Sequence, residues 1–243
     1  MSWLEREELL FGPEFVARLK ESTVAIIGVG GVGGAAAEMV ARAGVGKLIL
    51  LDADTVSDSN RNRQIIALTS TLGQPKCAVL SQRLKDINPE IEILCIEQYL
   101  EANKVEETLA PYAAEIDFLI DAIDTLSPKL SLIRYCVENK IPLVSSMGAG
   151  AKFDVTKIRI ADLSRSFNCP LAFIVRKRLK KMGISKGFPV VFSEELPERS
   201  SIVEAEERNK KSQVGSISYI PFVFGCACAQ AALLYLKNQD KSL

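Results

Sequence analysis

Three glycines, a later carboxylate and a group of basic and amide side chains could together bind a phosphorylated nucleotide. Gly28, Gly30 and Gly33 have the spacing G-x-G-x-x-G, in which a backbone without side chains can turn tightly and approach a phosphate. Asp52 follows at a spacing that lets a carboxylate accept a hydrogen bond from a ribose. The side chains that could neutralise or hydrogen-bond phosphate oxygens are Asn60, Arg63, Gln64 and Lys76.

A further carboxylate, Asp124, comes directly after an apolar run, at the place where ligands of parallel sheets bind. A carboxylate that faces a polyphosphate usually holds a bridging Mg²⁺, so we expect a magnesium site at Asp124.

Lys76 has two interpretations. It stands near the start of a predicted helix that runs to Ile87, where a cation opposes the helix dipole and a bound anion would explain it. Alternatively, Lys76 is simply an exposed lysine.

The segments around these residues have the pattern of a strand, a turn and a helix. The apolar run 24–27 predicts a buried strand, the glycine cluster follows it, and the Ala-rich stretch 35–43 predicts a helix. Gly44 is a plausible helix C-cap, and 47–52 predicts a second strand that ends in Asp52. This context favours a bound nucleotide over a glycine-rich turn without a ligand.

Strands and helices alternate through the first 150 residues. Strands are predicted at 91–96, 117–124 and 141–145, and helices at 101–109 and 125–140. This alternation predicts an α/β fold, a doubly wound and mostly parallel Rossmann-like sheet. We expect residues 1–150 to form the nucleotide-binding domain, with residues 1–21 as an amphipathic helical segment.

Residues 151–243 have a different pattern, and we expect them to form a lobe packed on the same sheet. Strands are predicted at 153–161, as an antiparallel strand, and at 188–193, a basic helix at 170–182 and a polar mobile loop at 194–216. The apolar helix 220–236 is short for a membrane span, so we interpret it as a buried helix or a dimer contact. Peripheral membrane association through this helix stays open.

Composition and charge limit the catalytic and metal-binding chemistry that this chain can perform. The 243 residues carry no net charge, but residues 152–187 hold ten Lys and Arg against two Asp, a local charge of +8. The chain has no histidine, which excludes imidazole as a base or metal ligand. Its six cysteines form no C-x-x-C pair, so we expect no zinc site. Because we recognise no secretory signal, we expect reduced thiols in a cytoplasmic protein.

Several longer stretches carry a resemblance to a known family. They are EREELLFG from residue 5, GVGGVGG from 28, DADTVSDSNRNRQ from 52, GQPK from 73, INPE from 87 and DAIDTLSPK from 121. Together they resemble the ThiF/MoeB/HesA superfamily of ubiquitin-activating-type adenylating enzymes. Later stretches, PLVSSMGAG, CPLAFIVRKRLKKMGISKG, VVFSEE and GSISYIPFVFG, are similar to the branch that dehydrates threonylcarbamoyladenosine in tRNA.

The resemblance implies ATP as the nucleotide and a role for each matching residue. Asp52 would bind the ribose, Lys76 the triphosphate and Asp124 the Mg²⁺. The phosphates and the reacting centre would be contacted by Asn60, Arg63 and Gln64, and the matching stretches add Gly31 and Asp54 to the cofactor-binding residues. Arg6 would reach the phosphates of the neighbouring subunit in a homodimer, although action within its own subunit stays open. The implied catalytic residues are Arg6, Arg63, Lys76 and Asp124.

The implied reaction is an ATP-dependent cyclisation in tRNA. The threonyl carboxylate of the modified adenosine would attack the α-phosphate of ATP and release pyrophosphate, and ring closure would then expel AMP. A basic patch could hold the anticodon arm through Arg176, Lys177, Arg178, Lys180 and Lys181, although a solvated surface is the alternative.

Other functions fit parts of the pattern. The main alternative is an adenylyltransferase that activates the C-terminus of a ubiquitin-like sulfur carrier, whose usual C-x-x-C zinc motifs are missing. An NAD-dependent oxidoreductase would leave Lys76 and Asp124 without a task, and an ATP sensor would not turn over its ligand. Binding of a monovalent cation also stays open. So does a role of Cys226 or Cys228 in sulfur transfer, either from a cysteine desulfurase or to a sulfur acceptor.

Overall fold

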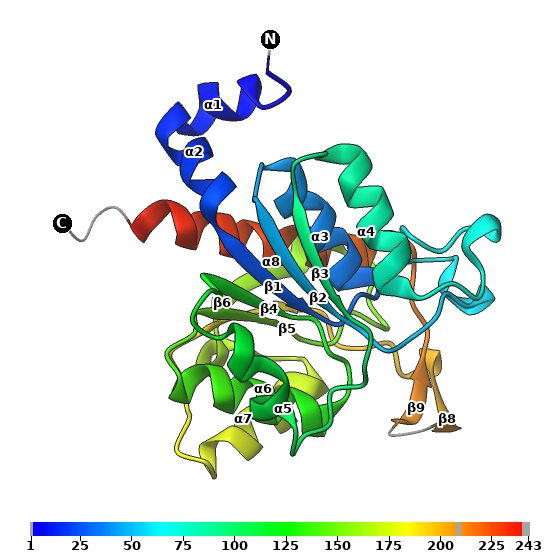
Figure 1. Ribbon diagram of the computed structural model, residues 1–243. Helices are drawn as coiled ribbons and strands as arrows, with labels where there is room; N and C mark the ends of the chain where they lie inside the picture. Colours follow the sequence, from blue (N-terminus) through cyan, green and yellow to red (C-terminus); the bar gives the residue numbers. More distant parts are fainter. Residues whose placement is uncertain (1, 208–209, 240–243) are drawn as a thin grey trace.

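A seven-stranded sheet forms the centre of the molecule, in the order β3-β2-β1-β4-β5-β7-β6 (Figure 1). A computed structural model describes residues 2–207 and 210–239. Adjacent strands are parallel except β6, which runs antiparallel to β7 at one edge. The strands are β1 Thr23–Ile27, β2 Lys47–Leu51, β3 Glu92–Ile96, β4 Phe118–Asp121, β5 Leu143–Ser146, β6 Ile158–Asp162 and β7 Pro189–Ser193. The predicted doubly wound, mostly parallel α/β fold is confirmed.

Helices cover both faces of the sheet, because neighbouring strand residues point to opposite faces. Ile26 packs with α3 (Gly31–Arg42), α4 (Lys76–Ile87) and α8 (Tyr219–Asn238), whereas Ile27 packs on the other side. That second side is covered by α5 (Val105–Leu109), α6 (Leu126–Glu138) and α7 (Pro170–Lys180). β1 is buried along its whole length, as its uninterrupted apolar run predicts.

The helix α8 is a core element. Gly225 allows it to approach α3 closely, since a Cβ there would lie 2.4 Å from the main-chain oxygen of Val32. Ile220, Phe224 and Cys228 are fully buried, so the interpretation of this segment as a buried helix is confirmed. By length and composition alone, this helix could cross a membrane. In the fold, 44% of its most apolar 18-residue stretch is buried.

Two short helices precede the sheet. α1 (Glu5–Phe11) and α2 (Pro13–Glu21) correspond to the predicted helical segment, and α2 leads directly into β1. α2 buries Phe15, Val16 and Leu19. By contrast, α1 has no buried residue and stands away from the sheet (Figure 1).

The prediction of a loop at 194–216 was wrong. β8 (Ile202–Glu207) and β9 (Lys210–Val214) pair there as an antiparallel hairpin. The base of the hairpin is held by main-chain hydrogen bonds from Gly215 to Ser201 and from Ala151 to Gly215. The sequence of β9 is polar apart from Val214, and that of β8 mixes Ile202, Val203 and Ala205 with three glutamates, so hydrophobic periodicity gave no clear sign of a ladder held by backbone hydrogen bonds.

Several predicted boundaries also differ from the structure. The helix expected at 101–109 is reduced to α5. β4 ends at Asp121 instead of Asp124, and the chain turns there, with the Asp121 carboxylate accepting a hydrogen bond from the main chain of Ile123. α3 begins at Gly31, inside the glycine cluster. Residues beyond 150 contribute β7 and β6 to the same sheet, and the boundary at residue 150 stays a prediction.

Candidate active site

The glycine turn joins the end of β1 to the start of α3, and two of its glycines are required by space. Gly28 has φ +91°, and a Cβ there would lie 2.9 Å from the main-chain oxygen of Ala122. A Cβ at Gly33 would lie only 1.8 Å from the oxygen of Gly28. At Gly30, the nearest described atom beyond the adjacent backbone is the side-chain nitrogen of Gln64, 3.8 Å from such a Cβ. The turn therefore packs tightly behind Gly28 and Gly33 and leaves space at Gly30, where a phosphate could approach.

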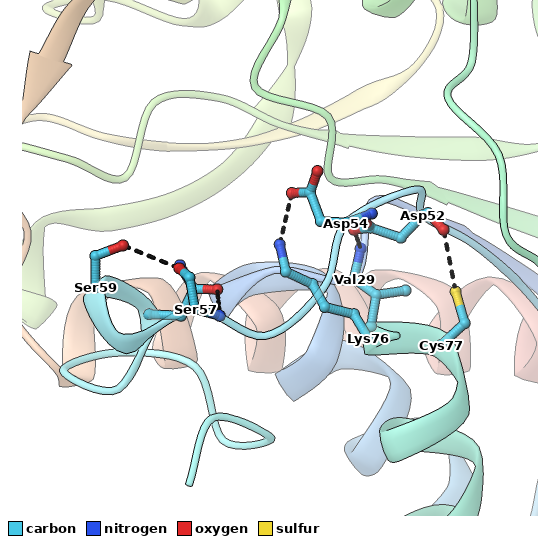
Figure 2. A network of polar contacts seen from close by, with 8 residues as sticks. Val29, Asp52, Asp54, Ser57, Ser59, Lys76 and Cys77 are labelled. Atoms are coloured by element: carbon cyan, nitrogen blue, oxygen red, sulfur yellow. Dashed lines mark hydrogen bonds and ion pairs between the residues drawn. The ribbon is translucent and has the colours of Figure 1, made fainter. Parts of the chain in front are cut away.

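Asp52 connects the end of β2 to this turn. Its Oδ2 accepts a hydrogen bond from the main-chain nitrogen of Val29 at 2.6 Å, and its Oδ1 accepts one from the nitrogen of Asp54 at 2.8 Å (Figure 2). Burial raises the pKa of the Asp52 carboxyl, while the charge of Lys76 and the two main-chain donors act in the opposite direction. The carboxylate is thus held at the point where a ribose could meet the sheet.

Lys76 is the first residue of α4, and it is buried. Its Nζ lies 2.7 Å from Oδ2 of Asp54, and its side chain is 6% exposed against 70% for Asp54 (Figure 2). The main-chain nitrogen of Lys76 also donates to the oxygen of Asp54 at 3.0 Å. The alternative of an exposed lysine is therefore wrong. A cation fixed at a helix N-terminus, with one solvent-facing partner, is suited to binding an anion.

The polar segment between Asp54 and Lys76 places the amide residues in different ways. Asn60 is buried, and its Oδ1 accepts a hydrogen bond from the main chain of Ser57 at 3.2 Å, so it shapes its own loop. Gln64 is also buried, and its Oε1 has no hydrogen-bond partner. Because an unpaired buried acceptor costs free energy, a donor from a ligand or water is expected at Gln64.

Arg63 is half-buried in the same segment. Its Nη1 donates to the main-chain oxygen of Ser59 and to Oδ1 of Asn62, both at 2.8 Å. Its main-chain oxygen would be 3.1 Å from a Cβ at Gly31, so the backbone of Arg63 passes directly beside the glycine turn. The other edges of the guanidinium are available for a fork-like contact with an oxyanion.

Asp124 is exposed in the turn between β4 and α6. This turn follows β4 at the same edge of the sheet as the glycine turn after β1, because the two strands are parallel neighbours. Mg²⁺ is commonly held by one or two carboxylates together with substrate phosphates, and Asp124 fits that arrangement. Within residues 2–207 and 210–239, no group of three potential metal-ligating side chains occurs.

A buried ion pair anchors the turn that carries Asp124. Lys129 Nζ lies 2.6 Å from Oδ2 of Asp121, and both side chains are 0% exposed. The ammonium also donates to Ser145 Oγ and to the main-chain oxygen of Ser146, which are 3.1 and 3.0 Å away. Sequence reasoning missed this brace. The available signal was a lysine among apolar residues on the predicted helix 125–140.

Arg6 is not brought together with the other candidates within one chain. It lies exposed on α1, which precedes β1, whereas the glycine turn follows β1. Leu9 and Leu10 on the same helix are 82% and 71% exposed. A role for Arg6 at this site therefore requires a second subunit or a movement of α1.

The basic helix α7 begins near the site and leads away from it. A Cβ at Gly148, just after β5, would lie 3.7 Å from Cys169 Sγ at the start of the helix. After the helix, Gly187 donates to Asp162, at the opposite end of the sheet. Arg176 is bound to Ser166, and the exposed cations of the later turns are Lys177, Arg178, Lys180 and Lys181. These cations lie toward the end of the parallel strands that is opposite to the glycine turn.

Comparisons with known proteins agree with this geometry. A model of the ThiF family matches residues 4–243. The tRNA threonylcarbamoyladenosine dehydratase of Bacillus subtilis (strain 168) is 42% identical over 228 residues, which is 90% of this chain and 89% of the relative. The molybdopterin-synthase adenylyltransferase of Escherichia coli (strain K12) is 37% identical over 166 residues, 68% of this chain and 65% of the relative.

A solved structure resembles the fold over nearly its whole length. The crystal structure of the E. coli tRNA N6-threonylcarbamoyladenosine dehydratase in complex with ATP has a TM-score of 0.88 and 32% identity, and the match covers 97% of this chain and 94% of that chain. The family match includes the glycine turn and the polar segments that follow it. The chain therefore belongs to the ThiF family.

Proposed function

We propose that this protein uses ATP to dehydrate threonylcarbamoyladenosine in tRNA to its cyclic form. The observation that carries the proposal is the buried Lys76 beside an open glycine turn, in a chain that matches a dehydratase of this name along 90% of its length. Such a site supplies positive charge and close backbone approach to phosphates, which an adenylation reaction needs and which requires no histidine base.

ATP would lie across the glycine turn with its ribose at Asp52. Its phosphates would face Gly30 and the N-terminus of α3, where main-chain amides and the helix dipole favour negative charge. Lys76 would exchange its contact with Asp54 for a phosphate oxygen. Arg63 and the side-chain amide nitrogens of Asn60 and Gln64 would donate to the phosphates and the reacting centre. The Oε1 of Gln64, which has no hydrogen-bond partner, would accept from a donor of the ligand or from water.

The reaction would proceed in two steps. A carboxylate oxygen of the threonyl group attacks the α-phosphorus of ATP, the bond to the bridging oxygen breaks, and pyrophosphate leaves. An atom of the carbamoyl group then attacks the activated carbonyl carbon, a ring closes and AMP leaves. Lys76 and Arg63 would stabilise the phosphate charge in both steps. Mg²⁺ held by Asp124 would neutralise further phosphate charge.

The working unit in this proposal is a homodimer. α1 exposes Leu9 and Leu10 and buries none of its residues, so a second subunit would shield an apolar surface that the monomer leaves in water. Arg6 on this helix would then reach the phosphates in the partner's site.

The nucleic-acid partner would be a tRNA that carries threonylcarbamoyladenosine, in the cytoplasm. The exposed cations of α7 would contact tRNA phosphates at a distance from the nucleotide, as an extended substrate requires. Reversing the charge of Lys177, Arg178 and Lys180 should weaken tRNA binding and reduce its salt dependence, while ATP binding stays unchanged. Equal tRNA affinity of this variant and the wild type would contradict the assignment of α7.

Nucleoside mass spectrometry tests the whole proposal. Modified tRNA is incubated with the protein, ATP and Mg²⁺, then digested, and a matched sample lacks ATP. We expect the modified nucleoside to lose one water only when ATP is present, with AMP and pyrophosphate formed in equal amounts. Pyrophosphate exchange that requires a small carrier protein instead of modified tRNA would favour the sulfur-carrier alternative, and an unchanged nucleoside would contradict the proposal.

A further inference from the structure

Two cysteines lie against each other directly behind the candidate ATP site. Cys77 follows Lys76 in the first turn of α4, and Cys95 lies on β3, which packs against that helix. The Cys95 thiol donates a hydrogen bond to the main-chain oxygen of Cys77, with the sulfur 3.6 Å from that oxygen. The sulfur of Cys77 is 3.7 Å from the main-chain oxygen of Asp52 (Figure 2). This pair therefore connects β3, α4 and the end of β2.

The two thiols differ in exposure and in acidity. Cys77 is fully buried, whereas Cys95 is half-buried. The Cys77 thiol can donate a hydrogen bond to the Cys95 thiolate, and this lowers the pKa of Cys95 to about 7. Burial and Glu97 act in the opposite direction, whereas Ser81 and Lys85 assist the lowering. The same hydrogen bond, together with burial, raises the pKa of Cys77. Because the thiolate is the nucleophilic form of cysteine, Cys95 is the thiol of the pair that reacts first with an oxidant.

We propose that Cys95 and Cys77 form a reversible disulfide in response to peroxide and that this bond weakens ATP binding. The Cys95 thiolate attacks one peroxide oxygen, the O–O bond breaks, and a sulfenic acid and water are formed after proton transfer. The Cys77 sulfur then attacks the sulfenic sulfur, hydroxide leaves and takes up the thiol proton as water, and the S–S bond forms. Overall two thiols are oxidised, and one peroxide is reduced to two waters.

The effect on ATP follows from the position of Cys77, and this part rests on the proposed function. A disulfide has a narrow range of geometries, so bond formation pulls the first turn of α4 toward β3. Lys76 is adjacent in that turn, and the Cys77 thiol can no longer donate to the main chain of Asp52. Both residues that we assign to ATP therefore shift when the bond forms. We expect roughly tenfold weaker ATP binding, the size expected when one charge-assisted contact is lost.

The test oxidises the purified full-length protein with one equivalent of hydrogen peroxide, alkylates the remaining thiols and maps disulfides by peptide mass spectrometry. We expect a cross-linked pair of peptides containing Cys77 and Cys95, which a thiol reductant removes. Cys95→Ala and Cys77→Ala should each abolish it. Cys226→Ala is the matched control, because Cys226 is half-buried on α8 and far from the pair in sequence, and it should form the same bond as the wild type.

ATP affinity is measured by calorimetry on the reduced, oxidised and re-reduced protein. The proposal expects the oxidised wild type to bind ATP more weakly, with recovery after reduction, and Cys95→Ala to be insensitive to peroxide. Oxidation of Cys95 without a link to Cys77, or a linked protein with unchanged ATP affinity, would overturn it. Failure of the reduced wild type to bind ATP would instead contradict the proposed function, since the disulfide is mapped without any activity.

Discussion

Lys76 and Asp54 form an ion pair in which the cation is buried and the anion faces solvent. Their charged atoms are 2.7 Å apart, with side-chain exposures of 6% and 70%. A buried ammonium cannot be hydrated freely, so it needs an anionic partner at all times. The exposed carboxylate is the partner that an incoming phosphate can replace, because water can hydrate the released Asp54 while the phosphate becomes the counter-charge of the ammonium.

Lys76→Met should therefore reduce turnover more than stability. We expect pyrophosphate formation to fall by about 10²- to 10³-fold, the usual effect of removing one donor that stabilises charge in the transition state. The measurement is the rate of ATP-dependent pyrophosphate release with modified tRNA. Lys104→Met is the control, because that lysine is half-exposed and its partner Glu101 is equally accessible. Similar rates for both variants would remove Lys76 from the mechanism.

Gly30 and Gly33 should respond differently to the same substitution. Gly33→Ala places a Cβ 1.8 Å from the oxygen of Gly28, so the turn must open and the folded state is expected to lose stability. Gly30→Ala meets no atom closer than 3.8 Å and should fold normally, but its methyl group occupies the space that we assign to phosphate. Thermal unfolding and ATP titration separate the two effects. Normal ATP affinity in folded Gly30→Ala would place the phosphates elsewhere.

The fold was predictable because its signals are local. Consecutive apolar residues such as Ile26 and Ile27 show that a strand is buried on both faces, and the glycine spacing shows where the chain must turn. The brace between Asp121 and Lys129 was not predictable, because its other partners, Ser145 and Ser146, come from a strand that only the folded sheet places beside it. Sequence patterns identified Lys76 as a candidate, but its burial depends on how α4 packs.

Removal of the lysine from that brace should be costly. Lys129→Met leaves the Asp121 carboxylate buried without a counter-charge, and we expect it to lower the free energy of unfolding by about 3–5 kcal/mol. The double variant Asp121→Asn with Lys129→Met removes both charges and should recover part of this loss. Urea unfolding of the two single variants and the double variant measures the coupling. Strictly additive losses would show that the pair does not act as a unit.

Glu38 provides a pH-dependent contact between α3 and α4. Burial alone raises the pKa of this carboxyl, but hydrogen bonds from Arg83 and Arg42, 2.7 and 2.8 Å away, outweigh it and hold the pKa below the ordinary value of 4.5. A lowered pKa means that the folded state releases the proton more readily than the unfolded chain. The stabilisation is therefore complete above pH 4.5 and is lost as the pH falls through the folded-state pKa.

Glu38→Gln should consequently be less stable than the wild type at pH 7, by about 1 kcal/mol given the partly exposed arginines. The difference should shrink as the pH falls below the folded-state pKa, where the wild-type carboxyl is also neutral. Urea unfolding across this pH range provides the measurement. Glu14→Gln, on the exposed surface of α2, is the control and should show no such dependence. A stability difference that is constant with pH would mean that the charge of Glu38 is not responsible.

Arg6 can be assigned to its own site or to the partner's site by mixing inactive variants. If Arg6 acts across the dimer, a subunit with Arg6→Ala keeps an intact Lys76 and receives Arg6 from a Lys76→Met partner, so one of the two sites in the mixed dimer is complete. Random exchange of subunits should then restore about a quarter of wild-type activity, because half of the dimers are mixed and each has one working site.

The matched control mixes Lys76→Met with Asp124→Ala. Both of these residues belong to the same subunit's site, so every site in that mixed dimer lacks one of them and no activity should return. Recovery only in the mixture that contains Arg6→Ala would show that α1, which lies at the opposite end of β1 from the glycine turn, serves the neighbouring subunit. No recovery in either mixture, with the dimer confirmed by sedimentation, would place Arg6 in its own subunit's site or outside the reaction.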